Sequence, residues 1–363
     1  MAGKVIHHEV AFDEGTKTKL FIYEKYLQAW LQVFLHSPFH QSTTLQIYDF
    51  FCGPGADRAG TKGSPIILMD ELAANEEKIT AAKDSVRVYF NDIDHAKVSE
   101  LRERCQINRY PWSPVFSSKD FAIAFGEEIG GIGVGPSLVF MDQFGVKHVT
   151  ERVFRSLAEC PNTDLLFFIA SDFKRRFGDL LSPELDISEA EMDRTPRHEI
   201  HRLIASRYKR WAPHNYHVGH FSIMKDNRIY GLVFGTGHWR GMEKFIDIAW
   251  KLDPECGDAN FPIEAERDQG VLDFSGGGEV FRKRKLELFK DALREKISGG
   301  HLKTDGDVFH FCLTNGISPS RGAGEIYKEM KAQRLLIWTK GNGPRYSSAS
   351  VKEPRILVLQ NGR

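Results

Sequence analysis

The sequence predicts an α/β protein with a doubly wound, mostly parallel Rossmann-like sheet that ends in an antiparallel hairpin, followed by a small winged-helix-like C-terminal unit. Two observations lead to this class. From residue 16 to residue 250, short β-rich runs alternate with amphipathic helical segments, as in parallel sheets covered by helices on both faces. The apolar run 45–51 then enters a turn with closely spaced glycines, where such a fold holds a nucleotide-like cofactor.

The first half of the sheet can be followed element by element. Apolar residues recur at three- and four-residue steps over 16–35, which predicts an amphipathic helix. After the strand 45–51 and its turn, Ser64 and Pro65 suit the start of a helix that ends near residue 78. The other predicted strands are 85–91, 115–118, 137–142 and 164–170, with helices over 97–105 and 149–159.

A polar insertion, 171–217, interrupts the alternation and contains a predicted helix over 197–211. Two β-rich runs, 218–224 and 229–236, are joined by a short polar turn and predict the antiparallel hairpin; a helix over 241–250 follows. We therefore expect a first domain over 1–273, including the insertion, and a second domain over 279–363 beyond the glycine-rich stretch 274–278.

The second domain has the pattern of a winged helix. A basic helix over 279–297 precedes helices over 305–314 and 318–336, and short strands are expected at 336–339 and 356–359. If 318–333 is a recognition helix, its basic residues would contact a nucleic-acid backbone (Arg321, Lys328, Lys331 and Arg334). A protein-interaction module is an equally good interpretation.

Composition narrows the class of protein. The chain has 363 residues, 41% of them hydrophobic and 27% charged, with 49 basic and 49 acidic side chains. This is the profile of a soluble globular protein with a large core. No run approaches the ~18 apolar residues of a membrane helix, and the N-terminus lacks the apolar core of a signal peptide, so we expect a cytoplasmic protein with no membrane partner.

Cysteine and histidine spacing predicts no metal site. The five cysteines lie more than fifty residues apart, and an odd number argues against a disulfide framework. The histidines between 198 and 220 match no standard ligand spacing, so ordinary surface or core histidines are the better interpretation.

Several short motifs, in this order, carry a resemblance. They are Asp49–Gly55, Gly63–Pro65, Asp142–Gly145, and Trp250 with Gly257–Phe261. On these the chain resembles the three-Cys-motif partner proteins, a bacterial family similar to class I S-adenosylmethionine-dependent methyltransferases, over residues 16 to 335. The resemblance implies S-adenosylmethionine as cofactor and a partner protein that bears a three-cysteine motif.

The resemblance also implies cofactor-binding residues. Asp49 would receive the ammonium of the cofactor, and Asp92 would accept both ribose hydroxyls, since a carboxylate offers two acceptor oxygens. Asp120 would reach the adenine amino group, although a simple turn residue is as good an interpretation. The remaining members of the predicted set belong to the turn and the helix start (Phe51, Gly53, Gly55, Gly63 and Ser64). The alternative is a strand-to-helix turn that binds nothing.

The predicted catalytic loop consists of Asp142, Gln143, Phe144 and Gly145. It occupies the place where amino-methylating enzymes orient an exocyclic amino group and stack its base, roles for which Asp142 and Phe144 are suited. The family pattern has a proline where this chain has Gln143, which leaves the loop less rigid and makes a non-catalytic loop the alternative.

Two groups of basic residues around the insertion favour nucleic acid as a partner. They are Lys174, Arg175 and Arg176 after the fifth strand, and Arg197, Arg202, Arg207, Lys209 and Arg210 on the predicted helix. A solvated helix face is the competing interpretation.

The sequence thus predicts an S-adenosylmethionine-dependent methyltransferase acting on nucleic acid at a base amino group. The alternative is a weak or inactive methyltransferase-like scaffold that binds a three-cysteine partner and nucleic acid. A dinucleotide oxidoreductase is disfavoured by Pro54 inside the glycine turn and by the long gap between Asp49 and Asp92.

Overall fold

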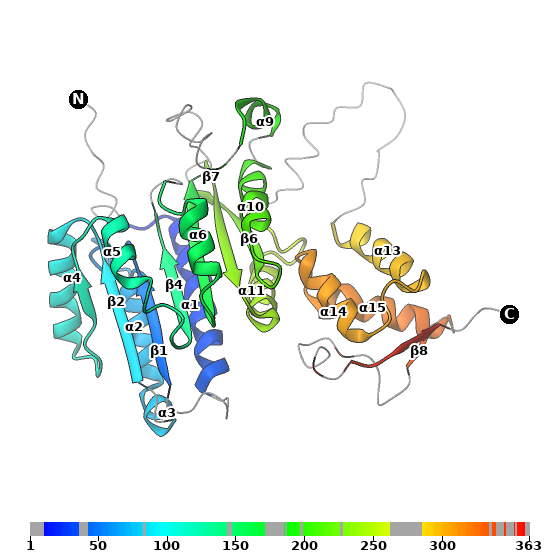
Figure 1. Ribbon diagram of the computed structural model, residues 1–363, viewed down its shortest axis with the longest axis horizontal. Helices are drawn as coiled ribbons and strands as arrows, with labels where there is room; N and C mark the ends of the chain where they lie inside the picture. Colours follow the sequence, from blue (N-terminus) through cyan, green and yellow to red (C-terminus); the bar gives the residue numbers. More distant parts are fainter. Residues whose placement is uncertain are drawn as a thin grey trace. The chain divides into compact units, whose positions relative to one another are not determined.

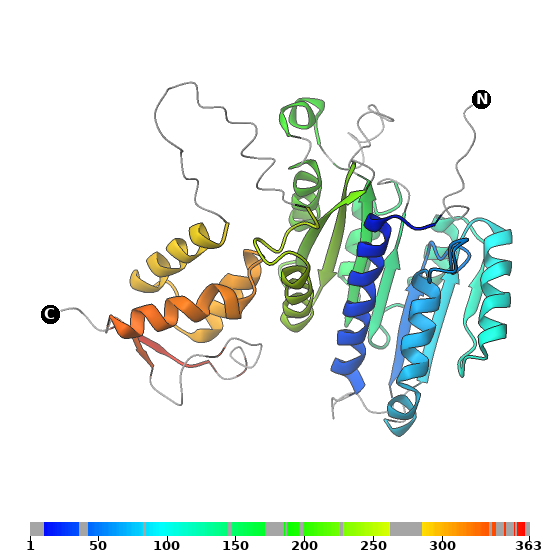
Figure 2. The ribbon, with the colours of Figure 1, turned by 180° about the vertical axis from the view of Figure 1, so that it is seen from behind.

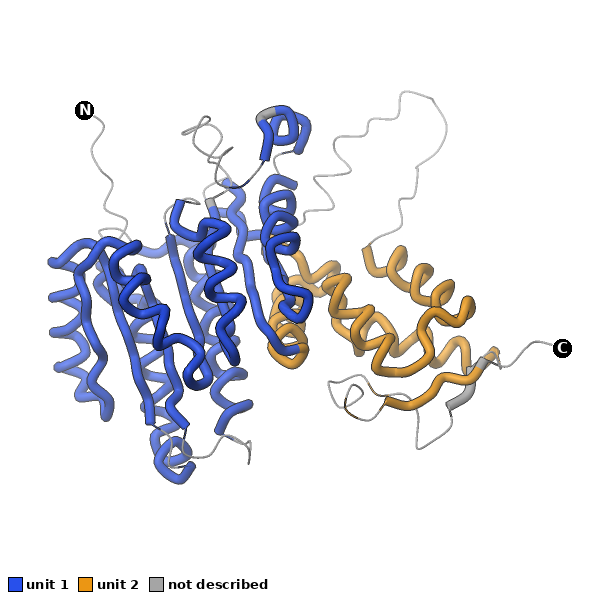
Figure 3. The backbone as a smooth tube through the Cα atoms, in the orientation of Figure 1, with its two compact units in different colours: residues 1–238 blue, residues 239–363 orange. Residues whose placement is uncertain are grey.

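The computed structural model describes residues 11–35, 43–82, 85–143, 147–170, 185, 187–196, 199–225, 228–261, 285–333, 336–338, 345, 352 and 354–359. The chain divides into two compact units, residues 1–238 and 239–363 (Figure 3). The boundary predicted from the sequence, between 273 and 279, lies outside the described residues.

Unit 1 is built on a seven-stranded sheet with the order β3-β2-β1-β4-β5-β7-β6 (Figure 1). Its strands are β1 (Thr44–Asp49), β2 (Ser85–Asn91), β3 (Val115–Ser117), β4 (Ser137–Met141), β5 (Thr163–Ala170), β6 (His217–Lys225) and β7 (Arg228–Thr236). The first five are parallel, and β7 pairs antiparallel with both β5 and β6. The predicted mostly parallel sheet with an antiparallel hairpin is confirmed.

The strand order places a switch point between β1 and β4. The chain adds β2 and β3 on one side of β1 and then returns to add β4 and β5 on the other. In open α/β sheets, ligands bind at such a point, beyond the carboxyl ends of the strands. Asp49 is the last residue of β1 and pairs in register with Phe140 of β4, so the polar residues after both strands meet there.

Helices cover both faces of this sheet. Helices α1 (Glu14–Leu35) and α2 (Ser64–Ala74) lie side by side on one face (Figure 2). The other face packs against α5 (Phe121–Glu128), α6 (Glu151–Ala158) and α10 (Ile200–Trp211), whose apolar side chains form one core with Val139, Met141, Leu165 and Phe167. Because both faces are buried, the central strands are almost continuously apolar.

Helix α1 is anchored to the middle of the sheet by aromatic residues. Tyr23 packs on Phe140 with ring centroids 4.5 Å apart, and Tyr26 packs on Phe234 at 4.6 Å. The Tyr26 hydroxyl donates to Asp164 of β5 at 2.6 Å. Burial raises the pKa of Asp164 to about 6, against the effect of this hydrogen bond. The apolar stripe predicted for this helix therefore faces the sheet.

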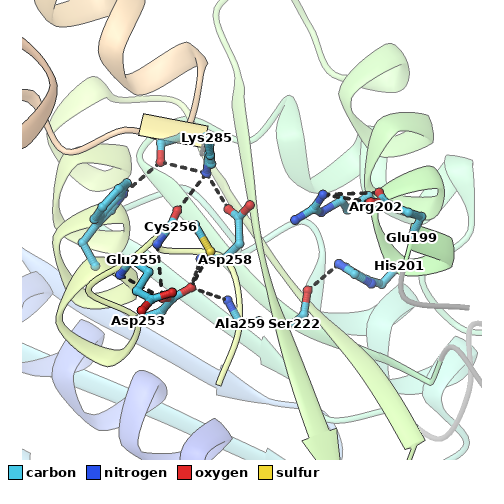
Figure 4. A network of polar contacts seen from close by, with 12 residues as sticks. Glu199, His201, Arg202, Ser222, Asp253, Glu255, Cys256, Asp258, Ala259 and Lys285 are labelled. Carbon is cyan, nitrogen blue, oxygen red and sulfur yellow. Dashed lines mark hydrogen bonds and ion pairs between the residues drawn. The ribbon is translucent and has the colours of Figure 1, made fainter. Parts of the chain in front are cut away.

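The other helices of unit 1 begin and end at residues that differ from the predicted bounds. The helix expected over 64–78 is interrupted at Asn75, whose side-chain amide donates to the carbonyl of Glu71, and α3 (Glu76–Ala81) follows. Helix α4 spans His95–Asn108, and the insertion contains α9 (Glu189–Arg194) before α10. Helix α10 is linked to β6 by a hydrogen bond between His201 Nε2 and Ser222 Oγ (Figure 4).

Unit 2 contains α11 (Trp239–Leu252), α13 (Lys285–Ser298), α14 (Asp305–Thr314), α15 (Pro319–Ala332) and the antiparallel pair β8 (Leu336–Trp338) and β9 (Leu357–Leu359). Helices α14 and α15 and the strand pair correspond to the elements predicted there, and the winged helix itself stays a prediction. Helix α13 forms ion pairs with the exposed acids of α15, Lys290 with Glu325 and Arg294 with Glu329.

A polar network joins the end of α11 to the start of α13 (Figure 4). Asp253 accepts backbone N–H groups from the following loop, including that of Asp258 at 3.0 Å. Lys285 donates to the Asp258 carboxylate at 2.6 Å and to the Cys256 carbonyl at 3.0 Å. The motif Gly257–Phe261 thus contributes Asp258, whose described contacts link the end of α11 to the start of α13 within unit 2.

Candidate active site

Asp49 is a buried carboxylate whose two oxygens are both held. The Ser64 hydroxyl donates to Oδ2 at 2.6 Å, and the Phe51 backbone N–H donates to Oδ1 at 3.1 Å. Burial, with a smaller effect of the Asp142 and Asp92 carboxylates, raises the pKa of Asp49 to about 7, against the effect of the two hydrogen bonds. Asp49 is therefore fixed in place, but its two hydrogen bonds offset only part of the free-energy cost of burying a carboxylate.

The glycines of the turn are required by backbone geometry. Gly53 and Gly55 have φ angles of 61° and 88°, in the left-handed region that other residues avoid. The Gly63 N–H donates to the Gly55 carbonyl at 2.7 Å, which brings the turn onto the start of α2. A Cβ on Gly55 would lie 2.7 Å from Leu101 Cδ1, and one on Gly63 would lie 3.0 Å from the Gly55 oxygen.

The ends of three neighbouring strands are tied together beside this turn. Asp92, after β2, accepts the N–H of Gly53 at 3.1 Å and that of Asp94 at 2.9 Å, one on each oxygen. Asn91 exchanges hydrogen bonds with the backbone of Lys119 after β3, at 3.0 and 3.1 Å. Each Asp92 oxygen keeps a second lone pair, so the carboxylate can still accept two hydroxyl groups.

Asp120 and an apolar residue complete this side of the site. Asp120 is exposed and caps α5 by accepting the Ala122 N–H at 2.9 Å. Ile93, which follows Asp92 and was not predicted, is 71% exposed. An exposed isoleucine between polar groups offers a surface that a flat apolar ring could cover. Ile93 could have been predicted from the sequence as a site residue, because it directly follows Asp92.

An aromatic cluster lies between the turn and the start of α5. Phe51 stacks on Phe121 with ring centroids 5.3 Å apart and an interplanar angle of 18°, and it contacts His148 at 5.1 Å. Burial lowers the pKa of His148, against the effect of the Asp120 carboxylate. The imidazole is therefore mainly neutral at pH 7.

Gln143 stands where the family pattern has proline, and it links the end of β4 to the described residues before α6. Its side chain is only 2% exposed, and Oε1 accepts the backbone N–H of His148 at 2.9 Å and that of Val149 at 3.3 Å. A side-chain amide thus spans the loop between β4 and α6. Phe144 and Gly145, the other two residues predicted for this loop with Asp142, lie outside the described residues.

Asp142 has a partner that the sequence interpretation missed. Lys19 of α1 forms an ion pair with Asp142 Oδ2, and its ammonium lies 4.9 Å from the centroid of the Phe168 ring. Lys19 is 6% exposed. The signal was available in the sequence, because Lys19 lies four residues before Tyr23 on the apolar stripe of α1, where a lysine needs a partner.

Two buried polar atoms in this region have no hydrogen-bond partner among the described residues: the Tyr23 hydroxyl and the Gln143 side-chain nitrogen. Burial and the nearby Asp49 carboxylate raise the pKa of Tyr23 well above its usual value. Buried polar groups are nearly always hydrogen-bonded, so the Tyr23 oxygen left over near the Asp49 carboxylate indicates a place for a polar ligand. An ammonium suits it, because it can donate to both Asp49 and the Tyr23 oxygen.

The charges of the site favour a cation over a phosphate. Asp92 and Asp142 both lie close enough to raise the pKa of Asp49, and Lys19 is paired with Asp142. Three carboxylates against one lysine would repel the phosphates that a glycine-rich turn and helix N-terminus bind in dinucleotide folds.

The predicted nucleic-acid residues are in different environments. Arg207 is 5% exposed and pairs with Glu191 at 2.6 Å, and Arg202 pairs with Glu199 at 3.1 Å, so we do not carry these two forward as phosphate ligands. Lys209 and Arg210 are exposed at the end of α10. The other four lie outside the described residues (Lys174, Arg175, Arg176 and Arg197).

Within the described ranges, no group of three or more histidine, cysteine or acidic side chains could hold a metal ion. In the same part of the chain, no helix has the length and apolar character needed to cross a membrane.

No family model matches the chain, and no curated protein matches it in sequence. Similar solved structures include a putative class I S-adenosylmethionine-dependent methyltransferase from Listeria monocytogenes, with 13% identity, a TM-score of 0.33 and coverage of 65% of this chain and 63% of that one. The O-methyltransferase from Bacillus cereus in complex with SAH has 13% identity, a TM-score of 0.34 and coverage of 62% and 91%. TrmN from Thermus thermophilus has 14% identity, a TM-score of 0.30 and coverage of 58% and 47%.

The chain spans less than two thirds of the Listeria protein and of a further methyltransferase, from Agrobacterium tumefaciens, at 63% and 61% of their lengths. At TM-scores of 0.34 and below, these similarities carry no argument about the activity of this chain.

Proposed function

We propose that this protein is an S-adenosylmethionine-dependent methyltransferase that acts on an amino group of a nucleic-acid base. The observation that carries the proposal is the buried Asp49 carboxylate at the switch point, held by Ser64 and Phe51 beside the unpartnered Tyr23 hydroxyl. These polar atoms suit an ammonium group, and S-adenosylmethionine carries one.

The described residues fit the rest of the cofactor. Asp92 would accept the ribose hydroxyls, and Ile93, Asp120 and Phe51 would surround the adenine. When bound, the cofactor supplies an electrophilic methyl group on a sulfonium, a cation that the three carboxylates favour. A dinucleotide is disfavoured by these charges and by the antiparallel β7 beside β5, where the dinucleotide fold adds a parallel strand.

Asp142 would hold the methyl acceptor. Its side chain is 32% exposed, and it follows β4 directly across the switch point from Asp49. A carboxylate there can accept an N–H of an exocyclic amine, orient the nitrogen lone pair and take the proton that the amine releases. Transfer by direct displacement needs no protein nucleophile, so orientation would supply most of the acceleration.

Nucleic acid as the source of this amine rests on weaker support. Lys209 and Arg210 are exposed at the end of α10 and suit contacts with a phosphate backbone. A partner protein with a three-cysteine motif belongs to the proposal on the resemblance alone.

Two experiments test this function. Calorimetry with S-adenosylmethionine, its demethylated product and NAD should show binding of the first two and none of the third; no binding of S-adenosylmethionine would refute the cofactor. Transfer of a labelled methyl group to DNA, tRNA and rRNA should then be found with the wild type and be reduced about 100-fold in Asp142→Asn. Undiminished transfer by Asp142→Asn would remove the assigned acceptor site.

A further inference from the structure

We propose that Lys19 is a positioning residue that holds one oxygen of Asp142 and directs the other toward the methyl acceptor, an inference that rests on the proposed function. The ion pair joins the first helix of the chain to the end of β4, two elements separated by 123 positions. Lys19 therefore belongs to neither of the motifs that define the two halves of the site.

The geometry gives Asp142 two unlike oxygens. Lys19 holds Oδ2 from the buried side, and the Phe168 ring under the ammonium leaves the lysine little access to water. Oδ1 has no hydrogen-bond partner among the described residues, while the side chain as a whole is 32% exposed. A carboxylate pinned by one oxygen offers the other in a fixed direction, which is what an acceptor for a substrate amine requires.

The charges explain why a cation is needed at this place. Two titratable groups act directly with Asp142: Lys19 on α1 is its ion-pair partner, and Asp49 on β1 is close enough to be affected by its charge. Asp92 after β2 and Tyr23 on α1 are in turn coupled to Asp49, and Lys147 and His148 follow Asp142 in the chain. The Asp142 carboxylate disfavours ionisation of Asp49, since a like charge in a partly buried site raises the pKa of its neighbour. Lys19 places a cation at Asp142, the one carboxylate that must accept a substrate N–H.

The decisive experiment follows Asp142 itself rather than turnover. In protein labelled with ¹³C at the aspartate carboxyl carbon, the Asp142 resonance, assigned with Asp142→Asn, should titrate at a pH at least one unit higher in Lys19→Met than in wild type. Lys19→Arg should restore the wild-type titration. Lys17→Met, on the same helix but paired with Glu14 at the surface, should leave it unchanged. S-adenosylmethionine affinity should stay within about threefold in Lys19→Met, because this lysine contacts no predicted cofactor ligand.

An unchanged Asp142 titration in Lys19→Met, or a failure of Lys19→Arg to do better than Lys19→Met, would overturn the inference. If Lys19→Met alone folds poorly, the double variant Lys19→Met with Asp142→Asn removes both charges and should regain thermal stability; a purely structural lysine would give no such recovery.

Turnover gives a second readout. The acid limb of the pH–rate profile for methyl transfer should move to higher pH in Lys19→Met, so that activity recovers partly in alkaline buffer. Equal loss at every pH would contradict the positioning role. If the wild type transfers no methyl group to any nucleic acid, the proposed function fails, and the carboxyl titration still decides the role of Lys19.

Discussion

The two halves of the candidate site are built in different ways. The cofactor half is held by contacts near in sequence or between adjacent strands, such as Ser64 to Asp49 over 15 positions and Gly63 to Gly55. The acceptor half depends on Lys19, 123 positions from Asp142, and on the buried side chain of Gln143. Most contacts of the first half lie in the turn between β1 and α2 and in the adjoining end of β2, whereas the second half joins α1 to the end of β4.

The most severe test of the cofactor half is Asp49→Asn. Removing the carboxylate that would receive the ammonium should weaken S-adenosylmethionine binding about 100-fold, as expected for a lost hydrogen bond between charged groups. Calorimetry measures this directly. Asp94→Asn is the matched control, because Asp94 is an exposed acid that caps α4 close to Asp92. This variant should bind the cofactor as tightly as the wild type. Equal affinities of Asp49→Asn and wild type would remove Asp49 from the site.

The same substitution should make the folded protein more stable at neutral and higher pH. The folded-state pKa of Asp49 is raised from 3.8 to about 7, so between these values the folded chain holds a proton that the unfolded chain releases. The free energy of unfolding of the wild type therefore falls as pH rises through this window, by up to about 4 kcal/mol from this group. Asp49→Asn lacks this loss. Urea unfolding at pH 5 and pH 8 should show its advantage over wild type growing with pH, and a constant difference would contradict the raised pKa.

The fold and the cofactor half could be predicted because their signals are local. The alternation of strands and helices and the turn glycines can be recognised in short stretches of sequence. An acid inside an apolar run, Asp49, likewise predicts a hydrogen-bonding partner. Helix boundaries moved where a single side chain decides them, as at Asn75, whose amide bonds to the backbone of α2 and interrupts the predicted helix.

The acceptor half could be predicted only in outline. The position of Asp142 after β4 follows from the strand pattern, but no window of sequence contains both Asp142 and Lys19. Gln143 was taken to weaken the loop because a proline is absent, whereas its amide oxygen accepts two backbone N–H groups. Whether a side chain forms such hydrogen bonds depends on which backbone groups the folded chain brings next to it, and the residue type alone does not predict this.

A third prediction separates tight packing from backbone conformation in the cofactor half. Gly55 and Gly60 have similar φ angles, 88° and 80°, but a Cβ on Gly55 would overlap Leu101 while one on Gly60 would meet open space. Gly55→Ala should cost about 2–4 kcal/mol of stability, from left-handed strain and overpacking together. Gly60→Ala should cost only the strain, about 1 kcal/mol. Thermal unfolding measures both. Equal losses would mean that the turn does not need its close approach to α4.

The last and smallest effect concerns Gln143, and it tests whether the two halves are separable. Gln143→Ala removes the acceptor for two backbone N–H groups and should cost about 1–2 kcal/mol of stability, whereas Gln106→Ala, at an exposed position on α4, should be nearly neutral. Cofactor affinity should not change, because Asp49, Asp92 and the glycine turn make no described contact with Gln143. Methyl transfer should fall about tenfold as the acceptor loop loosens. A parallel loss of cofactor affinity would show that the loop supports the cofactor half as well, and the contrast between a self-contained motif and an assembled acceptor site would no longer hold.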